Sequence, residues 1–94
     1  MSQPTIGRIV HYRMADDDVT QCRHELSHNP PRLLKQFNQP QAGQTYAAIV
    51  TSVTEHPDHP DVNLRVLLDG PFDFFAPSRD EGEAPGTWHW PERA

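Results

Sequence analysis

Both tryptophans of this 94-residue chain stand two positions apart near its C-terminal end, at Trp88 and Trp90. Successive side chains of an extended strand point to opposite faces, so a spacing of two places both indole rings on the same face. A chain end that carries this much apolar area frays unless it is packed against the rest of the molecule. We therefore expect residues 87–90 to form a short closing strand whose indoles either fill the core or contact a partner.

Alternation of apolar and polar residues indicates four further strands. The first covers residues 6–13, where Val10 and Tyr12 share one face and Ile9 and His11 share the other. The next strands are expected at residues 46–54, 62–69 and 72–76, separated by turns rich in Pro, Gly and Asp. In the second of the five strands one side is expected to hold Ile49, Thr51 and Val53. In the third, the inward side is expected to hold Val62, Leu64, Val66 and Leu68.

The segment between the first two strands has a helical pattern instead. Asp16–Asp18 offers a helix cap and favourable negative charge in a first turn, and residues 19, 22 and 26 follow at helical spacing up to about Ser27. Asn29-Pro30-Pro31 ends this helix, because proline lacks the backbone donor and restricts the residue before it. The same residues also permit a second helical turn over 33–37, before a loop at 38–44.

These elements describe one domain over residues 1–94 that is mainly β, with a helical insertion (α+β) at about residues 15–44 between strands 1 and 2. Five short antiparallel strands are typical of an SH3-like small barrel, in which the first and last strands pair and seal the sheet. The core of so short a chain is modest, since the hydrophobic fraction is 35% and ten residues are proline. Association into a homo-oligomer would add buried area, and we expect it.

Charge and composition exclude several classes of protein. A formal charge of −5 is opposite in sign to that expected of a protein that binds duplex nucleic acid. Without a run of about 18 apolar residues or a signal-peptide pattern, the sequence predicts a cytoplasmic protein that does not bind a membrane. The single cysteine, Cys22, excludes an internal disulfide and fits a reducing compartment.

No pattern in the chain predicts catalysis. His24 and His28 stand four apart on the expected helix, yet two ligands do not make a metal site, and a solvated helix face is the preferred interpretation. The repeat within His56–Asp61 is interpreted as a rigid turn. Cys22 is the one candidate nucleophile, but on a helix it would not face His24. We therefore expect no enzyme activity, no metal and no cofactor.

What remains is a binding surface where the first and last strands meet. Aromatic rings stack on flat ligands or fill pockets of a partner, and arginine binds carboxylates and phosphates. The candidate contact residues are Arg8, His11, Tyr12, Arg65, Trp88, His89 and Trp90. The alternative for both tryptophans is ordinary core packing.

Three motifs carry a family resemblance: Ile6–Tyr12 at the start, Ala48–Thr51 in the middle and Gly86–Glu92 at the end. They resemble a group of small proteins of tailed phages and prophages with a GRxVHY-like opening and a GTWHWPE-like ending. The resemblance implies a phage-encoded binding protein that acts in the host cytoplasm. It would counter host defence by binding a defence protein or by sequestering a small nucleotide signal. The alternative is a structural or assembly accessory of the virion.

Overall fold

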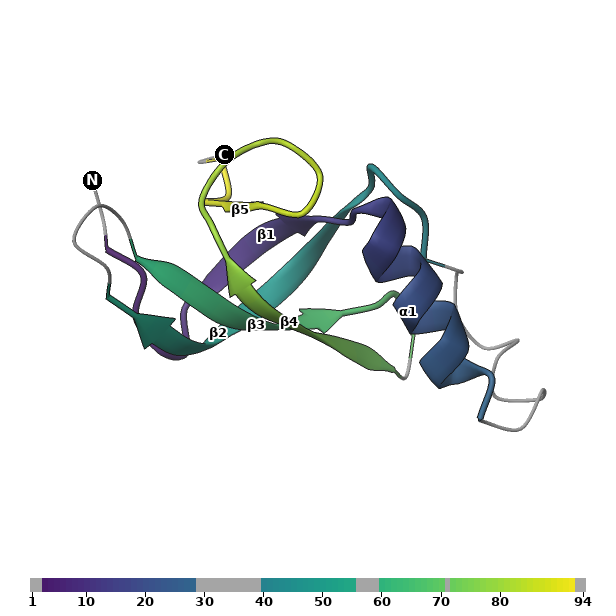
Figure 1. Cartoon of the computed structure of the whole chain (residues 1–94). Helices are drawn as coiled ribbons and strands as arrows, with labels where there is room; N and C mark the ends of the chain where they lie inside the picture. Colours follow the sequence, from purple (N-terminus) through teal and green to yellow (C-terminus); the bar gives the residue numbers. More distant parts are fainter. Residues whose placement is uncertain (1–2, 29–39, 56–59, 71, 93–94) are drawn as a thin grey trace.

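The computed structural model describes residues 3–28, 40–55, 60–70 and 72–92 of the chain. One helix and five strands are present in these residues (Figure 1). In chain order they are β1 (Ile9–Arg13), α1 (Asp16–Leu26), β2 (Thr45–Thr54), β3 (Asp61–Leu67), β4 (Asp73–Arg79) and β5 (Trp88–His89). The chain is therefore mainly β, as the alternation predicts.

The five strands form one antiparallel sheet in the order β4-β3-β2-β1-β5. The predicted pairing of the first and last strands is confirmed, with His11 opposite His89 and Tyr12 opposite Trp88. The sheet is not closed, because β4 and β5 are its two edges. A single parallel bridge between Glu81, just after β4, and Trp88 links the two edge regions.

The inward face of the sheet carries the core. Val10, Ala48, Val66 and Phe74 lie side by side across β1 to β4, and each is at most 1% exposed. Each strand contributes alternate residues to this face, which is the pattern expected when one side of a sheet is buried. The predicted inward set of the third strand is confirmed in full: Val62, Leu64, Val66 and Leu68.

Helix α1 stands at one end of the curved sheet (Figure 1) and completes the core there. Its apolar stripe consists of Val19, Cys22 and Leu26, all buried, at the spacing that places side chains on one helix face. The helix begins after Ala15, and its first turn holds the three aspartates, where negative charge is favourable. The carboxylate of Asp18 accepts a hydrogen bond from the backbone N–H of Ala15 at 3.1 Å, so it caps the helix from inside the first turn.

Two register irregularities change which side chains face inward. Between Val50 and Ser52 the β2–β3 register shifts, and Val53 then packs against the core. The prediction that Ile49, Thr51 and Val53 share one side is therefore wrong for Val53, because a bulge reverses the alternation. A second shift, between β3 and β4, places Leu64 opposite Ala76 but Val62 opposite Arg79. The extra residue in β4 changes the face to which the Arg79 side chain points.

The other differences from the predicted elements concern their ends. Strand β1 begins at Ile9 instead of residue 6, because Gly7 has a φ of 92° and the N–H of Arg8 bonds back to the carbonyl of Thr5. Strand β5 is reduced to two residues, and β4 extends to Arg79. The predicted second helical turn at 33–37 and most of the 56–61 turn lie outside the described residues.

Candidate functional site

The β1–β5 pairing brings together six of the seven predicted contact residues. Arg8 precedes β1, which contributes His11 and Tyr12, while the C-terminal segment contributes Trp88, His89 and Trp90. The seventh, Arg65, lies on β3 and is separated from β1 by the whole of β2. The structure therefore groups six of the predicted contact residues around β1 and β5 and places Arg65 elsewhere.

Strand alternation then divides the six residues between two faces. Tyr12 and Trp88 lie opposite each other on the inward face, and both are 0% exposed. Their role as contact residues stays a prediction, but in this structure their rings are part of the core. His11 and His89 form the neighbouring cross-strand pair and keep part of their surface exposed on the outward face.

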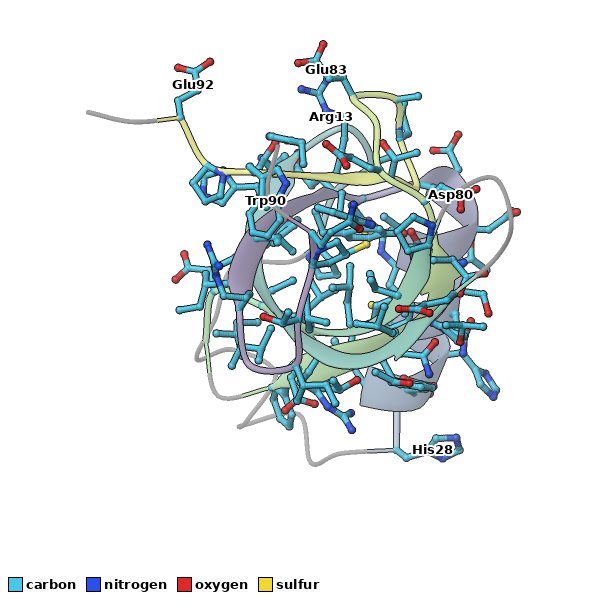
Figure 2. All side chains as sticks on the ribbon, turned by 90° about the vertical axis from the view of Figure 1, so that its left-hand side faces the viewer. Arg13, His28, Asp80, Glu83, Trp90 and Glu92 are labelled. Carbon is cyan, nitrogen blue, oxygen red and sulfur yellow. The ribbon has the colours of Figure 1, made fainter. Side chains whose placement is uncertain are left out.

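The two tryptophans pack against each other at the end of β5. Their rings are perpendicular, with centroids 5.4 Å apart, an arrangement that aromatic quadrupoles favour. The guanidinium of Arg8 lies 4.9 Å from the centroid of the partly exposed Trp90 ring. Figure 2 shows Trp90 close to the point where the C-terminal segment crosses β1. Trp90 is therefore held on one side by Trp88 and on the other by a cation–π contact.

A buried polar network lies at the α1 end of the same strands. The Tyr12 hydroxyl donates to Oδ2 of Asp18, and Arg79 donates from Nε to the Tyr12 hydroxyl at 2.9 Å and from Nη2 to Oδ1 of Asp18 at 2.8 Å. Burial, followed by the hydrogen bond to Asp18, raises the pKa of Tyr12. The network joins β1, α1 and β4, and a carboxylate with this many donors satisfies its charge inside the fold.

Sequence reasoning missed Asp18 and Arg79 as members of a common network. Their separation of 61 positions leaves no local spacing to detect, and the β3–β4 bulge that turns Arg79 inward depends on tertiary pairing. The one available signal was Asp18 at the third helical position, where an acid reaches back to the helix start. Because its donors come from the same chain, we assign this network to stability.

The outward histidine pair has a different environment. The rings of His11 and His89 are perpendicular, with centroids 5.7 Å apart. Arg13 lies two residues further along β1 on the same face, and its backbone bonds to Thr87 and Gly86 beside β5. Among the described residues, the buried side-chain nitrogens without a hydrogen-bond partner are Nε of Arg13 and Nδ1 of His89. Both belong to this cluster, which sequence analysis recognised only in its two histidines.

The candidate nucleophile of the sequence, Cys22, lies buried on α1. The Cys22 side chain is 1% exposed, and burial, followed by the charges of Glu25 and Asp18, raises its thiol pKa to about 12. A thiol with so high a pKa supplies almost no thiolate near neutral pH. The rings of His24, on α1, and His28, just after it, have centroids 5.3 Å apart, and both side chains are exposed. In the described parts of the chain, no three His, Cys, Asp or Glu side chains gather in a way that could hold a metal ion.

Comparison with known proteins found no match among family models, curated proteins or solved structures. Within the described residues, no helix has both the length and the apolar character needed to cross a membrane.

Proposed function

We propose that this chain is a phage-encoded binding protein that counters host defence by docking on a host protein, without catalysis. The phage origin comes from the GRxVHY-like and GTWHWPE-like motifs at residues 7–12 and 86–92. The buried state of Cys22 supports the absence of nucleophilic catalysis, since its raised pKa keeps the candidate nucleophile protonated. The single observation that carries the proposal is an exposed row of side chains on the outward face of the sheet.

This exposed row crosses four neighbouring strands. Strand register places Ile9 of β1 beside Ile49 of β2, Ile49 beside Arg65 of β3, and Arg65 beside Phe75 of β4. Ile9 is 57% exposed and Phe75 is 42% exposed, while Leu67, two residues beyond Arg65, is 41% exposed. Scattered exposed apolar residues are normal, but a contiguous row of them marks an interaction surface.

The composition of the exposed row suits a protein partner. The guanidinium of Arg65 lies 5.4 Å from the Phe75 ring and 3.4 Å from the carboxylate of Asp73, and both charged side chains are about half exposed. Aromatic residues and arginine are enriched in the centres of protein interfaces. We infer a partner that presents an apolar patch with a carboxylate for Arg65.

The same observations favour a protein over a sequestered nucleotide. A base needs an open aromatic face to stack on, and Tyr12 and Trp88 are 0% exposed. The partly exposed Trp90 already has the Arg8 guanidinium over its ring. The nucleotide hypothesis has its own test, a thermal-shift screen with cyclic and linear nucleotides, in which a rise in melting temperature that inorganic phosphate does not reproduce would favour a signal-sequestering function.

The test compares capture of host proteins by wild-type protein, Phe75→Ser, and Ile6→Ser as the matched control. Ile6 is 73% exposed and lies outside the row, so its variant removes a similar apolar area. We expect wild type and Ile6→Ser to retain the same protein in a fixed ratio and Phe75→Ser to lose it, with titration of that purified protein giving at least about a tenfold weaker affinity for Phe75→Ser. Equal affinities of wild type and Phe75→Ser would overturn the proposal.

Two further measurements separate the other roles of this surface. If light scattering shows a dimer that Phe75→Ser dissociates, the exposed row joins two copies of this chain and the host-protein proposal is wrong. Mass spectrometry of purified particles that finds several copies per virion would likewise replace it with a structural role.

We also propose that the fold is related to small SH3-like barrels. The support is the contact between the ends of the sheet, where the N–H of Trp88 donates to the carbonyl of Asp80 at 3.1 Å and the N–H of Gly82 donates to the carbonyl of Trp88 at 2.8 Å. These bonds join the segment after β4 to β5 although no continuous ladder does so. An experimental structure in which residues 80–82 lie apart from β5 would contradict this relation.

A further inference from the structure

We propose that His11, His89 and Arg13 form a binding site for a phosphate-type oxyanion on the outward face of β1 and β5. This cationic cluster is distinct from the exposed row, whose apolar and Arg65 contacts serve a protein partner. The proposal depends on the residues that surround two nitrogen donors and not on the proposed function.

The first argument is the placement of the two donors. Nε of Arg13 and Nδ1 of His89 are buried and have no partner within the described structure. Buried polar groups are paired in the great majority of cases, so two unpartnered nitrogens in one small cluster require an explanation. The Nε of arginine always carries a proton, and the histidine nitrogen carries one in one neutral tautomer and whenever the ring is charged. Both are therefore suited to an acceptor oxygen.

The second argument is the geometry of the cluster. His11 and His89 face each other across the β1–β5 pair, and Arg13 follows His11 by two positions, which makes it the diagonal neighbour of His89. Both Arg13 and His89 keep part of their side chains at the surface, although the two nitrogens themselves are buried. On the β2 side the neighbours are Ala47 and Thr45, which are small and uncharged.

The third argument concerns charge. The chain carries a net charge of −5, yet this corner holds one guanidinium and two imidazoles. Tetrahedral oxyanions with two negative charges suit several donors that approach from different directions. Glu83 belongs to the loop after β4 whose Gly86 and Thr87 bond to the Arg13 backbone, and Figure 2 shows Glu83 and Arg13 at the same edge of the molecule. The Glu83 carboxylate is therefore the competing acceptor that the experiment has to test.

The test is calorimetric titration of the full chain with inorganic phosphate at constant ionic strength at pH 8, where most of the phosphate carries two negative charges. Arg13→Gln should weaken binding at least about tenfold, since a hydrogen bond to a charged group is lost. His89→Ala should weaken binding as well, because the unpartnered Nδ1 is lost. Arg23→Gln is the matched control, because Arg23 is an exposed arginine on α1 and not on the β1–β5 pair, and it should bind like wild type.

Two further measurements test whether the phosphate group alone is recognised and whether Glu83 competes for the same donors. AMP binding with the same Arg13 dependence, and no binding of adenosine, would assign the affinity to the phosphate group. Glu83→Gln should tighten phosphate binding by removing the competing carboxylate. The proposal is overturned if wild type, Arg13→Gln and Arg23→Gln respond alike, or if Glu83→Gln destabilises the fold while phosphate fails to bind, because Glu83 is then the acceptor.

Discussion

Two arginine clusters that both include residues of β1 differ in how their donors are used. At the α1 end, Arg79 donates to Tyr12, to Asp18 and, from Nη1, to the carbonyl of Pro77 at 3.0 Å. On the outward face, Nε of Arg13 has no acceptor among the described residues. A buried network in which each of these donors has an acceptor stabilises the fold and has no donor left for a ligand. A cluster at the surface that retains a donor without an acceptor can still bind a partner.

The largest expected effect comes from breaking the saturated network. Arg79→Ala would leave the 4% exposed side chain of Asp18 without its counter-charge, and we expect a loss of about 3 kcal/mol in the free energy of unfolding. Urea denaturation followed by tryptophan fluorescence measures it. Arg65→Ala is the control, because the Arg65–Asp73 pair is half exposed and should contribute at most about 0.5 kcal/mol. Equal effects of the two variants would mean that Asp18 is not buried as a charge.

A smaller loss is expected from the tyrosine hydroxyl alone. Tyr12→Phe keeps the ring in the core but removes a group that donates to Asp18 and accepts from Arg79. We expect a cost of about 1–2 kcal/mol in the same urea experiment. The double variant Tyr12→Phe/Arg79→Ala should cost less than the sum of the single changes, since both act on one network. Strict additivity would contradict the network.

The stability of the fold at alkaline pH tests the burial of Cys22 and Tyr12. Burial raises the pKa of Cys22 from 9.0 to about 12, so the folded state keeps a proton that the unfolded state loses. This contribution to stability is complete below pH 9 and is lost as the pH rises towards 12, with a slope of at most about 1.4 kcal/mol per pH unit. Tyr12, whose pKa is also raised, adds to the loss above pH 10. In Cys22→Ala the decline should begin near pH 10, which unfolding curves at pH 8 to 11 would detect.

The smallest effect concerns the tryptophan corner. Arg8→Gln removes the guanidinium that lies 4.9 Å from the Trp90 ring, an exposed cation–π contact that contributes about 0.5 kcal/mol. We expect a small change in unfolding free energy and a shift of the emission maximum, because Trp90 loses a charged neighbour and Trp88 packs against Trp90. An unchanged spectrum would show that Arg8 does not rest on Trp90 in solution.

The sequence predicts the local and alternating features of this fold well. The inward sides of β1 and β3, the stripe of α1 and the pairing of the first and last strands all follow from periodicity of two or 3.6 residues. Bulges are the main source of error, because one extra residue reverses the side on which Val53 and Arg79 point and no composition signal marks it. A continuous closed ladder was also predicted, and the sheet has open edges instead.

The candidate site was predictable only in part, for the same reason. The proximity of His11 to His89 follows from strand pairing. The burial of Nε of Arg13 depends instead on the tertiary position of the loop at residues 80–87, which bonds to the Arg13 backbone. Assigning Tyr12 and Trp88 to a contact surface required knowing which face each strand buries. If the predicted alternation is shifted by one residue, a ring such as Tyr12 is placed on the exposed face and an imidazole such as His11 is placed in the core.

The position of β1 between β2 and β5 has a consequence for biosynthesis. Its partner His89 lies almost a full chain length away from His11, and β5 supplies Trp88, the largest fully buried side chain. During translation β1 can pair with β2 early, but its second edge must wait until residues 88–89 have left the ribosome. Ribosome-bound nascent chains that end before Trp88 should therefore remain sensitive to proteases, and completion of the last strand should make them resistant.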